Sequence, residues 1–375
     1  MTQTDVVFTL AGDVRHNSRA IKQLRLLRSL GLTVTIFALG QNPGVPFPGA
    51  GVQLNLLPRP SASGPRFFWN VHRMFLQAAR NVPARVYHAS DLYSLPAMRL
   101  AAKIHRSRLV YDARELYSHV AATAGRPWVR AFWFQAERRN IGATHAVFTV
   151  SDSIADRLSR SYRIARPAVL HNVPDMQHPL PAGTLRVRAG VDNDTVLILH
   201  QGHVQRNRGC FALVDAMHDI HGAAAVFMGG GSLMASLKRA VRERGLDMRV
   251  RFVDPVPPDE LLPVTADADL GVTLLEDTCL NHRYALPNKL FEYLMAGVPV
   301  LASDLREMRA VVQDFNVGMV VHPSDRTALV RTLQRCVDDA EARQQWSINA
   351  AKVFDRYSWA IASERFTTAY RKLLA

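Results

Sequence analysis

The segment spanning residues 281–300 carries residue types that suit a phosphate group, and it reads NHRYALPNKLFEYLMAGVPV. Pro287 suits the first turn of a helix, and Gly297 suits its C-terminal cap. The unpaired amides beside Pro287 and the helix dipole favour a diphosphate, while Lys289 adds a full positive charge. About one turn further along, Glu292 can accept two hydrogen bonds from a ribose diol. The segment therefore predicts a nucleotide diphosphate site. An ordinary capped amphipathic helix explains the same residues equally well.

Two glycine-containing loops follow expected strands in the second half of the chain. Residues 201–209 read QGHVQRNRG and place Arg206 and Arg208 behind a strand. The planar guanidinium of arginine suits a diphosphate. Residues 229–231 are three consecutive glycines. A solvent-facing basic loop and a tight strand-to-helix turn are the alternative interpretations of these two loops.

The run PNKLFEYLMAGVPV closely resembles a signature of the retaining glycosyltransferases of family 4. The match to that signature is dense and specific. The resemblance covers most of the chain and is strongest between Asn281 and Val300. It implies an α/β fold of the GT-B type, in which two doubly wound, Rossmann-like domains face a cleft. It also implies a nucleotide-sugar co-substrate, UDP- or GDP-linked, and no cofactor. Glu292 matches the glutamate that binds the nucleotide ribose in the family. Tyr284 stands where the family usually has a second glutamate near the donor sugar, so that contact departs from the family pattern.

The resemblance extends to the glycine loops of the second half. Arg208 takes the place of the basic residue that grips the donor diphosphate, and Gly202 lies in the family's glycine loop. Arg206 is the candidate for a second charge, because the family's usual arginine is replaced by His203. Gly230 lies in a short turn that approaches the nucleotide base in the family. The donor-binding candidates are therefore Gly12, Gly202, Arg206, Gly230, Tyr284, Leu286, Pro287, Asn288 and Glu292, and the catalytic candidates are Arg208, Lys289, Asp112 and Glu115.

The first half contributes two of these loops. Gly12 lies in a loop that resembles a loop of the related enzymes, one that approaches the donor phosphate and the acceptor. A plain turn in which Asp13 leads into the next helix explains the same residues equally well. The stretch around Asp112 resembles a family segment whose histidine lies near the reaction centre, and Arg114 replaces that histidine. Arginine does not act as a base at working pH. Asp112 or Glu115 would then orient the acceptor hydroxyl, or the donor phosphate would take its proton. Pairing of both carboxylates with Arg114 is the structural alternative.

Metal and disulfide chemistry are not indicated. Asp267 and Asp269 have the spacing of a metal-binding Asp-x-Asp motif, but they precede an expected strand, and the cationic residues around the phosphate would do the work of a metal. The three cysteines lack paired metal-ligand spacing, which favours a reducing compartment. The first ten residues carry no secretion leader. We therefore expect a cytoplasmic protein, with the inner face of the cytoplasmic membrane as a second possibility.

The positive charge is confined to the first half. Residues 1–175 contain 23 Lys and Arg against 9 Asp and Glu, whereas residues 176–375 contain 23 of each. This asymmetry predicts an anionic partner for the first half, and we expect a lipid-linked acceptor or an anionic membrane rather than nucleic acid. Residues 65–75 and 126–134 mix aromatic and basic residues, which suits a membrane interface. Aromatic core packing is the alternative.

Short apolar runs alternate with amphipathic stretches throughout, as in strand, crossover helix and parallel strand. Helices are expected at Ser18–Leu30, Leu233–Arg244, Leu286–Ala296 and Trp359–Leu374. The expected strands are Val6–Leu10, Thr33–Ala38, Val52–Leu57, Val86–His88, Leu109–Asp112, Ala146–Val150, Ala168–Leu170, Val196–His200, Ala224–Met228, Val250–Val253, Leu270–Leu274, Val298–Leu301 and Gly318–Val321.

A stretch rich in Pro, Gly and polar residues, 175–183, is the expected linker between two domains. Residues 1–175 would form an acceptor-binding domain, and residues 184–355 a nucleotide-sugar-binding domain. Residues 356–375 would form a helix that crosses back to the first domain. The site is expected between the domains, where the carboxyl ends of parallel strands meet.

The sequence thus predicts a metal-independent, retaining, hexosyl-type glycosyltransferase that serves surface polysaccharide assembly. A nucleotide-sugar epimerase of the same architecture is one alternative, although it would need no basic acceptor domain. A non-catalytic nucleotide- or membrane-binding relic is the other, suggested by Tyr284 and Arg114.

Overall fold

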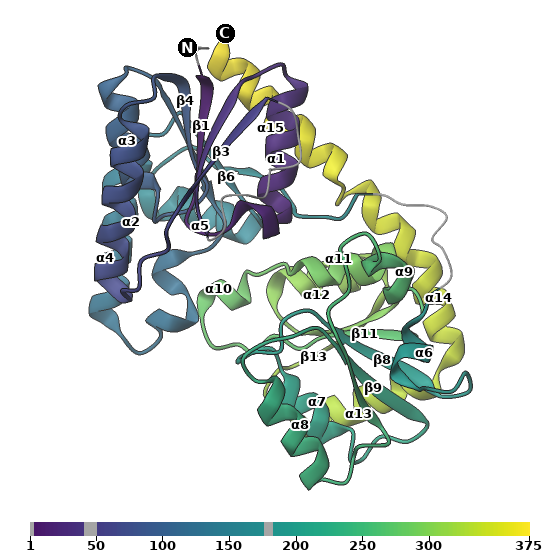
Figure 1. The fold of residues 1–375 in the computed structure, drawn as a ribbon. Helices are drawn as coiled ribbons and strands as arrows, with labels where there is room; N and C mark the ends of the chain where they lie inside the picture. The colour runs from purple at the N-terminus through teal and green to yellow at the C-terminus, as the bar shows by residue number, and fades with distance from the viewer. Residues whose placement is uncertain (1–3, 41–50, 176–182) are drawn as a thin grey trace. The chain divides into compact units, whose positions relative to one another are not determined.

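A computed structural model describes residues 4–40, 51–175 and 183–375. These residues form two compact units. Unit 1 comprises Met1–Asn172 together with Trp359–Ala375, and unit 2 comprises Val173–Ser358. Most of the predicted linker, residues 176–182, lies outside the described residues. Each unit is a parallel sheet covered by helices on both faces, which confirms the α/β fold class (Figure 1).

Unit 1 contains a seven-stranded parallel sheet with strand order β3-β2-β1-β4-β5-β6-β7. The order reverses between β1 and β4, which is the point where doubly wound sheets bind ligands. All seven predicted strands of this half are present, within about two residues at each end. The strands are β1 (Thr4–Leu10), β2 (Val34–Leu39), β3 (Val52–Leu57), β4 (Ala84–Ala89), β5 (Arg108–Ala113), β6 (Ala146–Thr149) and β7 (Ala168–Val169).

The helices of unit 1 lie on both sides of its sheet. Figure 1 shows α2, α3 and α4 on one side, and α1 on the other. The helices are α1 (Ser18–Ser29), α2 (Gly64–Ala79), α3 (Leu95–Ile104), α4 (Pro127–Ile141), α5 (Asp152–Tyr162) and α15 (Trp359–Leu374), with short 3-10 turns η1 (Val14–His16), η2 (Tyr117–His119) and η3 (Ala121–Thr123).

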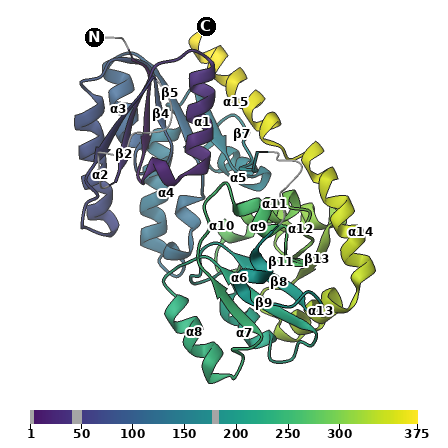
Figure 2. The same cartoon turned by 45° about the vertical axis from the view of Figure 1, so that its right-hand side comes forward.

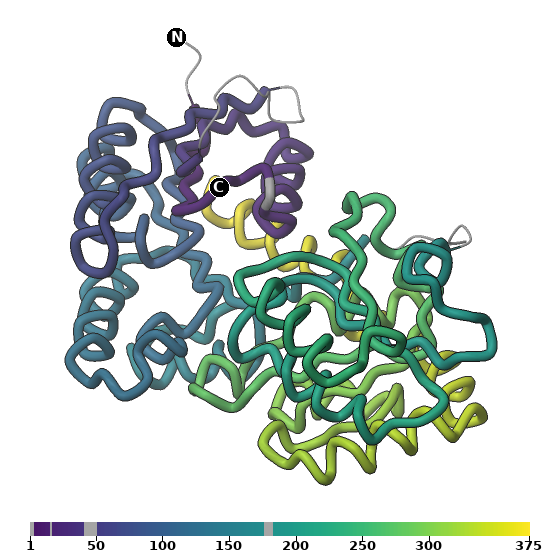
Figure 3. The backbone as a smooth tube through the Cα atoms, turned by 60° about the horizontal axis from the view of Figure 1, so that its bottom comes forward, coloured from purple at the N-terminus to yellow at the C-terminus, as the bar shows by residue number. Residues whose placement is uncertain are grey.

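The last helix, α15, is part of unit 1 although it follows unit 2 in sequence. Phe366 and Tyr370 are fully buried in the same apolar cluster as Phe8 of β1 and Leu24 of α1. The Tyr370 hydroxyl lies 2.6 Å from Nδ1 of the buried His88. Figures 1, 2 and 3 show α15 running beside α1. The chain therefore leaves unit 2 after Ser358 and ends on the first sheet.

Unit 2 contains a six-stranded parallel sheet with strand order β10-β9-β8-β11-β12-β13. The order reverses between β8 and β11, which again marks the expected ligand edge. The strands are β8 (Val196–Gln201), β9 (Ala223–Met228), β10 (Val250–Val253), β11 (Leu270–Thr273), β12 (Val300–Ser303) and β13 (Gly318–Val321).

Two apolar clusters hold the helices of unit 2 against opposite faces of the sheet. One cluster joins α6, α9, α11 and α12 to the sheet, and the other joins α7, α8 and α13. The helices are α6 (Leu185–Ala189), α7 (Cys210–Ala216), α8 (Met234–Glu243), α9 (Leu261–Thr265), α10 (Leu280–Arg283), α11 (Asn288–Met295), α12 (Arg306–Phe315), α13 (Arg326–Asp338) and α14 (Ala340–Ala350), followed by the 3-10 turn η4 (Ala351–Asp355).

The segment from α11 to β12 differs from its prediction at both boundaries. Pro287 is the N-cap residue in an extended conformation (φ −71°, ψ 142°), so the helix begins at Asn288 rather than in the turn before it. At the other end Gly297 takes a left-handed φ of +75°, and the Val298 amide bonds back to the Tyr293 carbonyl. Val298 therefore still belongs to the helix end, and β12 begins at Val300 instead of Val298.

Candidate active site

The start of α11 presents unpaired backbone donors, as its sequence predicts. The Leu290 amide donates to the Pro287 carbonyl over 3.1 Å. Among the described residues, the amides of Asn288 and Lys289 have no protein acceptor, and no side chain caps the helix. The side chain of Leu286 is partly buried against the core of unit 2, and its contact with a donor stays a prediction. The eight-residue helix thus keeps free N–H groups and the positive end of its dipole at this position.

Lys289 lies in a cationic, partly buried environment beside these amides. Its Nζ atom is 3.5 Å from Nε2 of His200, which is fully buried at the end of β8. Burial, and then the nearby charge of Arg208, lower the pKa of Lys289 to about 8. Burial, and then Lys289, lower the pKa of His200 well below its usual value, so the imidazole is neutral at pH 7. An anion placed here would relieve an unfavourable concentration of positive charge.

Arg208 is held near Lys289 by a tightly folded loop between β8 and α7. Gly209 caps α7 with a left-handed φ of +67°, and a Cβ atom there would lie 2.4 Å from the Leu274 carbonyl oxygen. The Glu276 amide donates to the Asn207 carbonyl over 3.1 Å. The loop is therefore fixed against the segment that follows β11, and the guanidinium charge of Arg208 lowers the pKa of Lys289. Two of the predicted diphosphate contacts thus come together.

The other members of this loop are more open. Arg206 is exposed, so the structure does not place it against the Lys289 cluster. Gly202 is also exposed and has a left-handed φ of +92°. A methyl group added at its Cα would meet open space, so the backbone conformation, and not crowding, favours glycine at this position. Their contacts with a donor stay predictions.

Glu292 is oriented by a polar side chain that our sequence reasoning did not select. Gln201 ends β8, is 1% exposed, and donates from Nε2 to Oε2 of Glu292 over 2.6 Å. Its other amide atom, Oε1, accepts from the Thr265 hydroxyl over 2.8 Å. The Gln201 backbone amide lies 3.0 Å from the Tyr293 hydroxyl. A glutamine at the end of a central strand, just before a glycine loop, was the available signal.

The three glycines after β9 are required chiefly by a close approach of two backbones. Cβ atoms at Gly229 and Gly231 would lie 2.1 Å from the Gly202 oxygen and 2.2 Å from the Val204 oxygen. The Val204 amide also donates to the Gly230 carbonyl over 2.9 Å. Gly230 itself is different, because the nearest atom to its Cβ position is 3.8 Å away. Protein packing therefore does not explain glycine at position 230, and its contact with a nucleotide base stays a prediction.

Tyr284 caps the C-terminus of the short helix α10, and its backbone amide donates to the Leu280 carbonyl over 3.2 Å. The side chain is partly buried. This places Tyr284 in the turn that leads to Pro287 and α11. Its contact with the donor sugar stays a prediction.

The predicted role of Asp112 in orienting the acceptor hydroxyl is contradicted by its burial. The carboxylate has no exposed surface and accepts hydrogen bonds from Nε and Nη2 of Arg19 at 2.8 and 2.7 Å. Gln23 donates to it over 2.9 Å, and Arg114 lies 3.8 Å away. Burial alone would raise the pKa of Asp112, but the charge and hydrogen bonds of Arg19 bring it to about 2. Asp112 is a structural ion-pair partner, chiefly of Arg19 on α1 rather than of Arg114.

The remaining candidates of unit 1 lie in loops at the carboxyl ends of its strands. Glu115 follows β5 and is exposed. Gly12 follows β1, and the nearest atom to its Cβ position is 4.0 Å away, so protein packing does not demand glycine there. Asp13 caps the turn η1 and pairs with Arg15 at 2.6 Å, in agreement with its interpretation as a turn residue.

Within the described residues, no group of three or more His, Cys, Asp or Glu side chains is arranged to hold a metal ion. Asp267 and Asp269 serve a structural purpose instead. Asp267 accepts from the Arg186 amide over 2.8 Å, and Asp269 pairs with the Arg186 guanidinium over 2.5 Å. These two carboxylates attach α6 to the sheet of unit 2.

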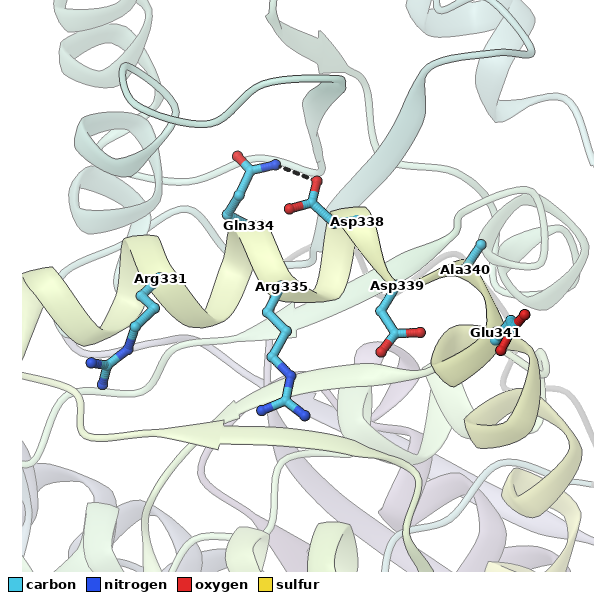
Figure 4. Close-up of a pocket in the computed structure, with 7 residues that line it drawn as sticks. All are labelled: Arg331, Gln334, Arg335, Asp338, Asp339, Ala340 and Glu341. Atoms are coloured by element: carbon cyan, nitrogen blue, oxygen red, sulfur yellow. Dashed lines mark hydrogen bonds between the residues drawn. The ribbon is translucent and has the colours of Figure 1, made fainter.

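A separate hollow of about 690 Å³ lies on the outer surface of unit 2, where α13 meets α14 (Figure 4). Its charges are mixed, and some are already engaged. Gln334 donates to Asp338 over 2.7 Å, and Asp339 caps α14 by accepting from the Ala342 amide. The residues drawn in Figure 4 come from these two helices and from Asp339 between them, and not from the elements that carry Lys289 and Arg208. The hollow is therefore distinct from the candidate active site.

Comparison with known proteins places both units in one class. Residues 183–353 match the family model "Glycosyl transferases group 1", and residues 17–174 match the model "Glycosyl transferase 4-like domain". The matching proteins include the D-inositol 3-phosphate glycosyltransferase of Corynebacterium diphtheriae, which is 26% identical over 48% of this chain and 43% of that enzyme. The alpha-D-kanosaminyltransferase of Streptomyces kanamyceticus is 25% identical over 76% of this chain and 73% of that enzyme. The first of these relatives is thus matched over less than half of its length.

Solved structures show the same fold. The sucrose-phosphate synthase of Thermosynechococcus elongatus matches with a TM-score of 0.82 at 18% identity, over 99% of both chains. Anabaena HepE in complex with UDP matches with a TM-score of 0.75 at 15% identity, over 99% of this chain and all of that one. The chain therefore belongs to the family 4 glycosyltransferases and has their GT-B fold.

Proposed function

We propose that this protein transfers a sugar from a nucleotide diphosphate to an acceptor hydroxyl. The observation that carries the proposal is the start of α11, where two unpaired amides lie beside Lys289, whose pKa burial and Arg208 lower to about 8. The charge of Glu292 offsets part of this lowering, but no carboxylate of the described residues forms an ion pair with Lys289. The site therefore has donors and positive charge without an ion-pair partner for Lys289. A diphosphate leaving group provides that partner, and its negative charge grows as the glycosidic bond breaks.

Each residue of this site has a distinct proposed role. Lys289, Arg208 and the amides of α11 stabilise the departing nucleotide diphosphate, which makes the transfer independent of a metal. Glu292 accepts hydrogen bonds from the ribose diol, and Gln201 fixes the orientation of its carboxylate. Gly202 and Gly230 allow close approach of the nucleotide, and Tyr284 lies toward the sugar.

The donor is proposed to be a UDP-linked hexose, with GDP-linked donors as the alternative. Support comes from the structural neighbour Anabaena HepE, whose structures include complexes with UDP and with UDP-glucose. We further propose that the anomeric configuration is retained, as the family resemblance implies. With Asp112 locked to Arg19, the proton of the acceptor hydroxyl passes either to Glu115 or to the departing phosphate.

The acceptor is proposed to be an anionic, lipid-linked saccharide held by unit 1 at the inner face of the cytoplasmic membrane, for surface polysaccharide synthesis. The support is the excess of 23 Lys and Arg over 9 Asp and Glu in residues 1–175. Peripheral contact with an anionic membrane follows from such an acceptor. Within the described residues, no helix has the length and apolar character needed to cross a bilayer.

Calorimetric titration of the purified chain with UDP and GDP tests the donor site. We expect one diphosphate to bind, and Glu292→Ala to weaken its affinity by about 1.5 to 3 kcal/mol, as for a charge-assisted hydrogen bond. Glu243→Ala on α8 is the matched control, since that glutamate is exposed in the same unit. Absence of binding by every nucleotide diphosphate would overturn the proposal and favour a relic.

Transfer itself is tested by incubating radiolabelled UDP- and GDP-hexoses with the chain and a bacterial membrane-lipid extract. Labelled lipid is the expected product, and NMR of its anomeric proton is expected to show the configuration of the donor. Conversion of the donor into an epimer without lipid labelling would identify an epimerase instead. Glu115→Gln separates the two proton routes, because it abolishes transfer only if that carboxylate takes the proton.

A further inference from the structure

Unit 1 contains an apolar groove between α2, α3 and α4 that none of the proposed roles uses. Its volume is about 220 Å³. The side chains that line it are almost entirely apolar or aromatic on their exposed surface, with Arg139 as the one cationic side chain among them. The lining residues are Phe68, Trp69, His72, Pro96, Phe132, Gln135, Ala136, Arg139 and Asn140. All of them belong to these three helices, which pack against one another within unit 1.

Part of the aromatic content of α2 and α4 is core, as the alternative interpretation of the sequence held. Phe68 is 5% exposed and makes edge contacts with Phe132 and Trp133 of α4, at 5.5 and 5.3 Å between ring centres. Phe75 is fully buried. The contacts of Phe68 join the two helices, and Phe68 and Phe132 also line the groove.

The outer surface of the same helices is unusually apolar. Trp69 is 56% exposed, Leu100 41%, Ile104 59% and Trp128 72%. These are four of the seven large hydrophobic residues that are exposed in the described part of the chain. Trp69 lines the groove, and the other three lie on the same helices. Isolated exposed apolar residues need no explanation, but several on three helices that share an apolar groove indicate a contact surface.

The charge on this surface has one sign. The sequences of α2, α3 and α4 contain seven basic residues, and all seven are exposed. Their one acidic residue, Glu137, is fully buried and bonded to the Tyr111 and Tyr162 hydroxyls, each at 2.7 Å. The basic residues are Arg66, Arg73, Arg99, Lys103, Arg130, Arg138 and Arg139. Exposed arginines without exposed carboxylates favour an anionic partner, and exposed tryptophans among them favour a partner with an apolar interior.

We propose that the α2–α3–α4 surface docks on an anionic lipid bilayer and that its groove accepts one acyl chain of a bilayer phospholipid. A cavity of about 150 Å³ lined by apolar side chains is large enough for benzene, so a groove of about 220 Å³ holds a short length of hydrocarbon chain. Burial lowers the pKa of His72, so this wall residue is neutral at pH 7 and adds no charge beside the chain. Arg139 and Arg99 lie at the rim, since the Arg99 guanidinium bonds to the Arg139 carbonyl over 2.7 Å, and both can meet lipid phosphates.

This inference deepens the membrane contact proposed above, because it assigns that contact to particular residues. It does not depend on the identity of the sugar donor or on catalysis. A bilayer is favoured over a protein partner because the exposed basic residues lie on all three helices with no exposed carboxylate on them, and exposed tryptophans lie on two of the three.

Flotation of the full-length chain with vesicles tests the docking surface. Vesicles of phosphatidylcholine alone are compared with vesicles that also contain phosphatidylglycerol. We expect binding to the anionic vesicles alone, and a loss of about 25-fold in partitioning for Arg73→Gln with Arg139→Gln, since each basic residue near an anionic surface contributes about fivefold. Arg239→Gln on α8, also exposed, is the matched control and is expected to bind normally.

The groove itself is tested with brominated acyl chains, which quench nearby tryptophan fluorescence. We expect strong quenching by vesicles of dibrominated phosphatidylcholine and phosphatidylglycerol. Quenching should be reduced in Trp69→Phe, which leaves Trp128 on the same surface, and reduced when Ala136→Phe fills the groove. Ile348→Phe, at a residue 60% exposed in unit 2, is the control for added aromatic volume. Undiminished quenching in Ala136→Phe would remove the acyl chain from the groove.

Two measurements keep this result separate from the sugar-transfer proposal. UDP affinity and the circular dichroism spectrum are recorded for every variant, and both are expected to match the unsubstituted chain. Flotation that is indifferent to lipid charge, or unchanged by the paired arginine substitutions, overturns the docking surface even if UDP binds. Failure to bind any nucleotide, with normal flotation, would instead refute the donor site and leave the docking surface standing.

Discussion

The depressed pKa of Lys289 leads to a quantitative prediction about nucleotide affinity. In the unliganded protein, burial and Arg208 lower this pKa from 10.5 to about 8. A bound diphosphate stabilises the ammonium and raises its pKa, so the complex holds the proton more tightly than the free protein does. Affinity is therefore at its full value below pH 8 and is lost as the pH rises toward the pKa of the complex.

The size of the effect follows from the difference between the two pKa values. If the diphosphate restores the pKa to 10.5, affinity falls about tenfold for each pH unit above 8, and the full difference is about 3 kcal/mol. Calorimetric titration with UDP between pH 7 and 9.5 measures the fall. Repeating it in buffers of different ionisation enthalpy measures the proton taken up on binding above pH 8.

Two variants at the same position make the result specific. Lys289→Arg keeps a charge at every pH and should bind with little pH dependence, so any titration of the ligand itself appears in this control. Lys289→Met should bind weakly at every pH. A pH dependence in Lys289→Met as steep as that of the unsubstituted chain would refute the assignment of the diphosphate to this lysine.

Three further predictions concern residues with defined packing. Gln201→Leu should weaken UDP binding by about 1 kcal/mol. Calorimetry on Gln201→Leu, Glu292→Ala and the double variant should show non-additive losses of affinity, because the two side chains bond to each other. Additive losses would mean that Gln201 does not act through Glu292. Asp112→Asn should lower the free energy of unfolding, measured in urea, by about 3 to 5 kcal/mol, because it leaves the buried Arg19 charge unpaired. An unchanged free energy of unfolding would return Asp112 to the catalytic candidates. Gly230→Ala should leave Tm unchanged but weaken nucleotide binding. Gly229→Ala should lower Tm, because its methyl group would meet the Gly202 oxygen. Equal Tm values for the two variants would contradict the packing of this turn.

Local sequence patterns predicted most elements of the fold because parallel strands and their helices have distinct periodicities. Strands such as β3 and β10, and the helix α15, begin and end where the sequence placed them. The misplaced start of β12 has a local cause, since Gly297 and Pro299 allow both a helix end and a strand start. Only the hydrogen bond from Val298 to Tyr293 assigns Val298 to the helix.

Long-range contacts are what the sequence did not reveal. Asp112 and Arg19 are 93 positions apart, and the sequence near Asp112 indicates only the more distant partner, Arg114, at 3.8 Å. Gln201 and Glu292 are 91 positions apart, so the link between the end of β8 and α11 emerges only when β8 and α11 come together on unit 2. A role that depends on the residue's own backbone was easier to predict, as for the left-handed Gly297 at the end of α11.

The contrast between Asp112 and Lys289 separates structural charge from functional charge in this protein. Asp112 is buried with a full set of partners, and its ion pair favours the folded state. Lys289 is partly buried near the charge of Arg208, and its Nζ atom lies 3.5 Å from the neutral His200. Between pH 8 and 10.5 the unfolded chain binds the Lys289 proton more tightly than the folded chain, so this group lowers stability as the pH falls through that range. A fold that tolerates such a cost at the start of a helix with unpaired amides is arranged for an anion that arrives with the substrate.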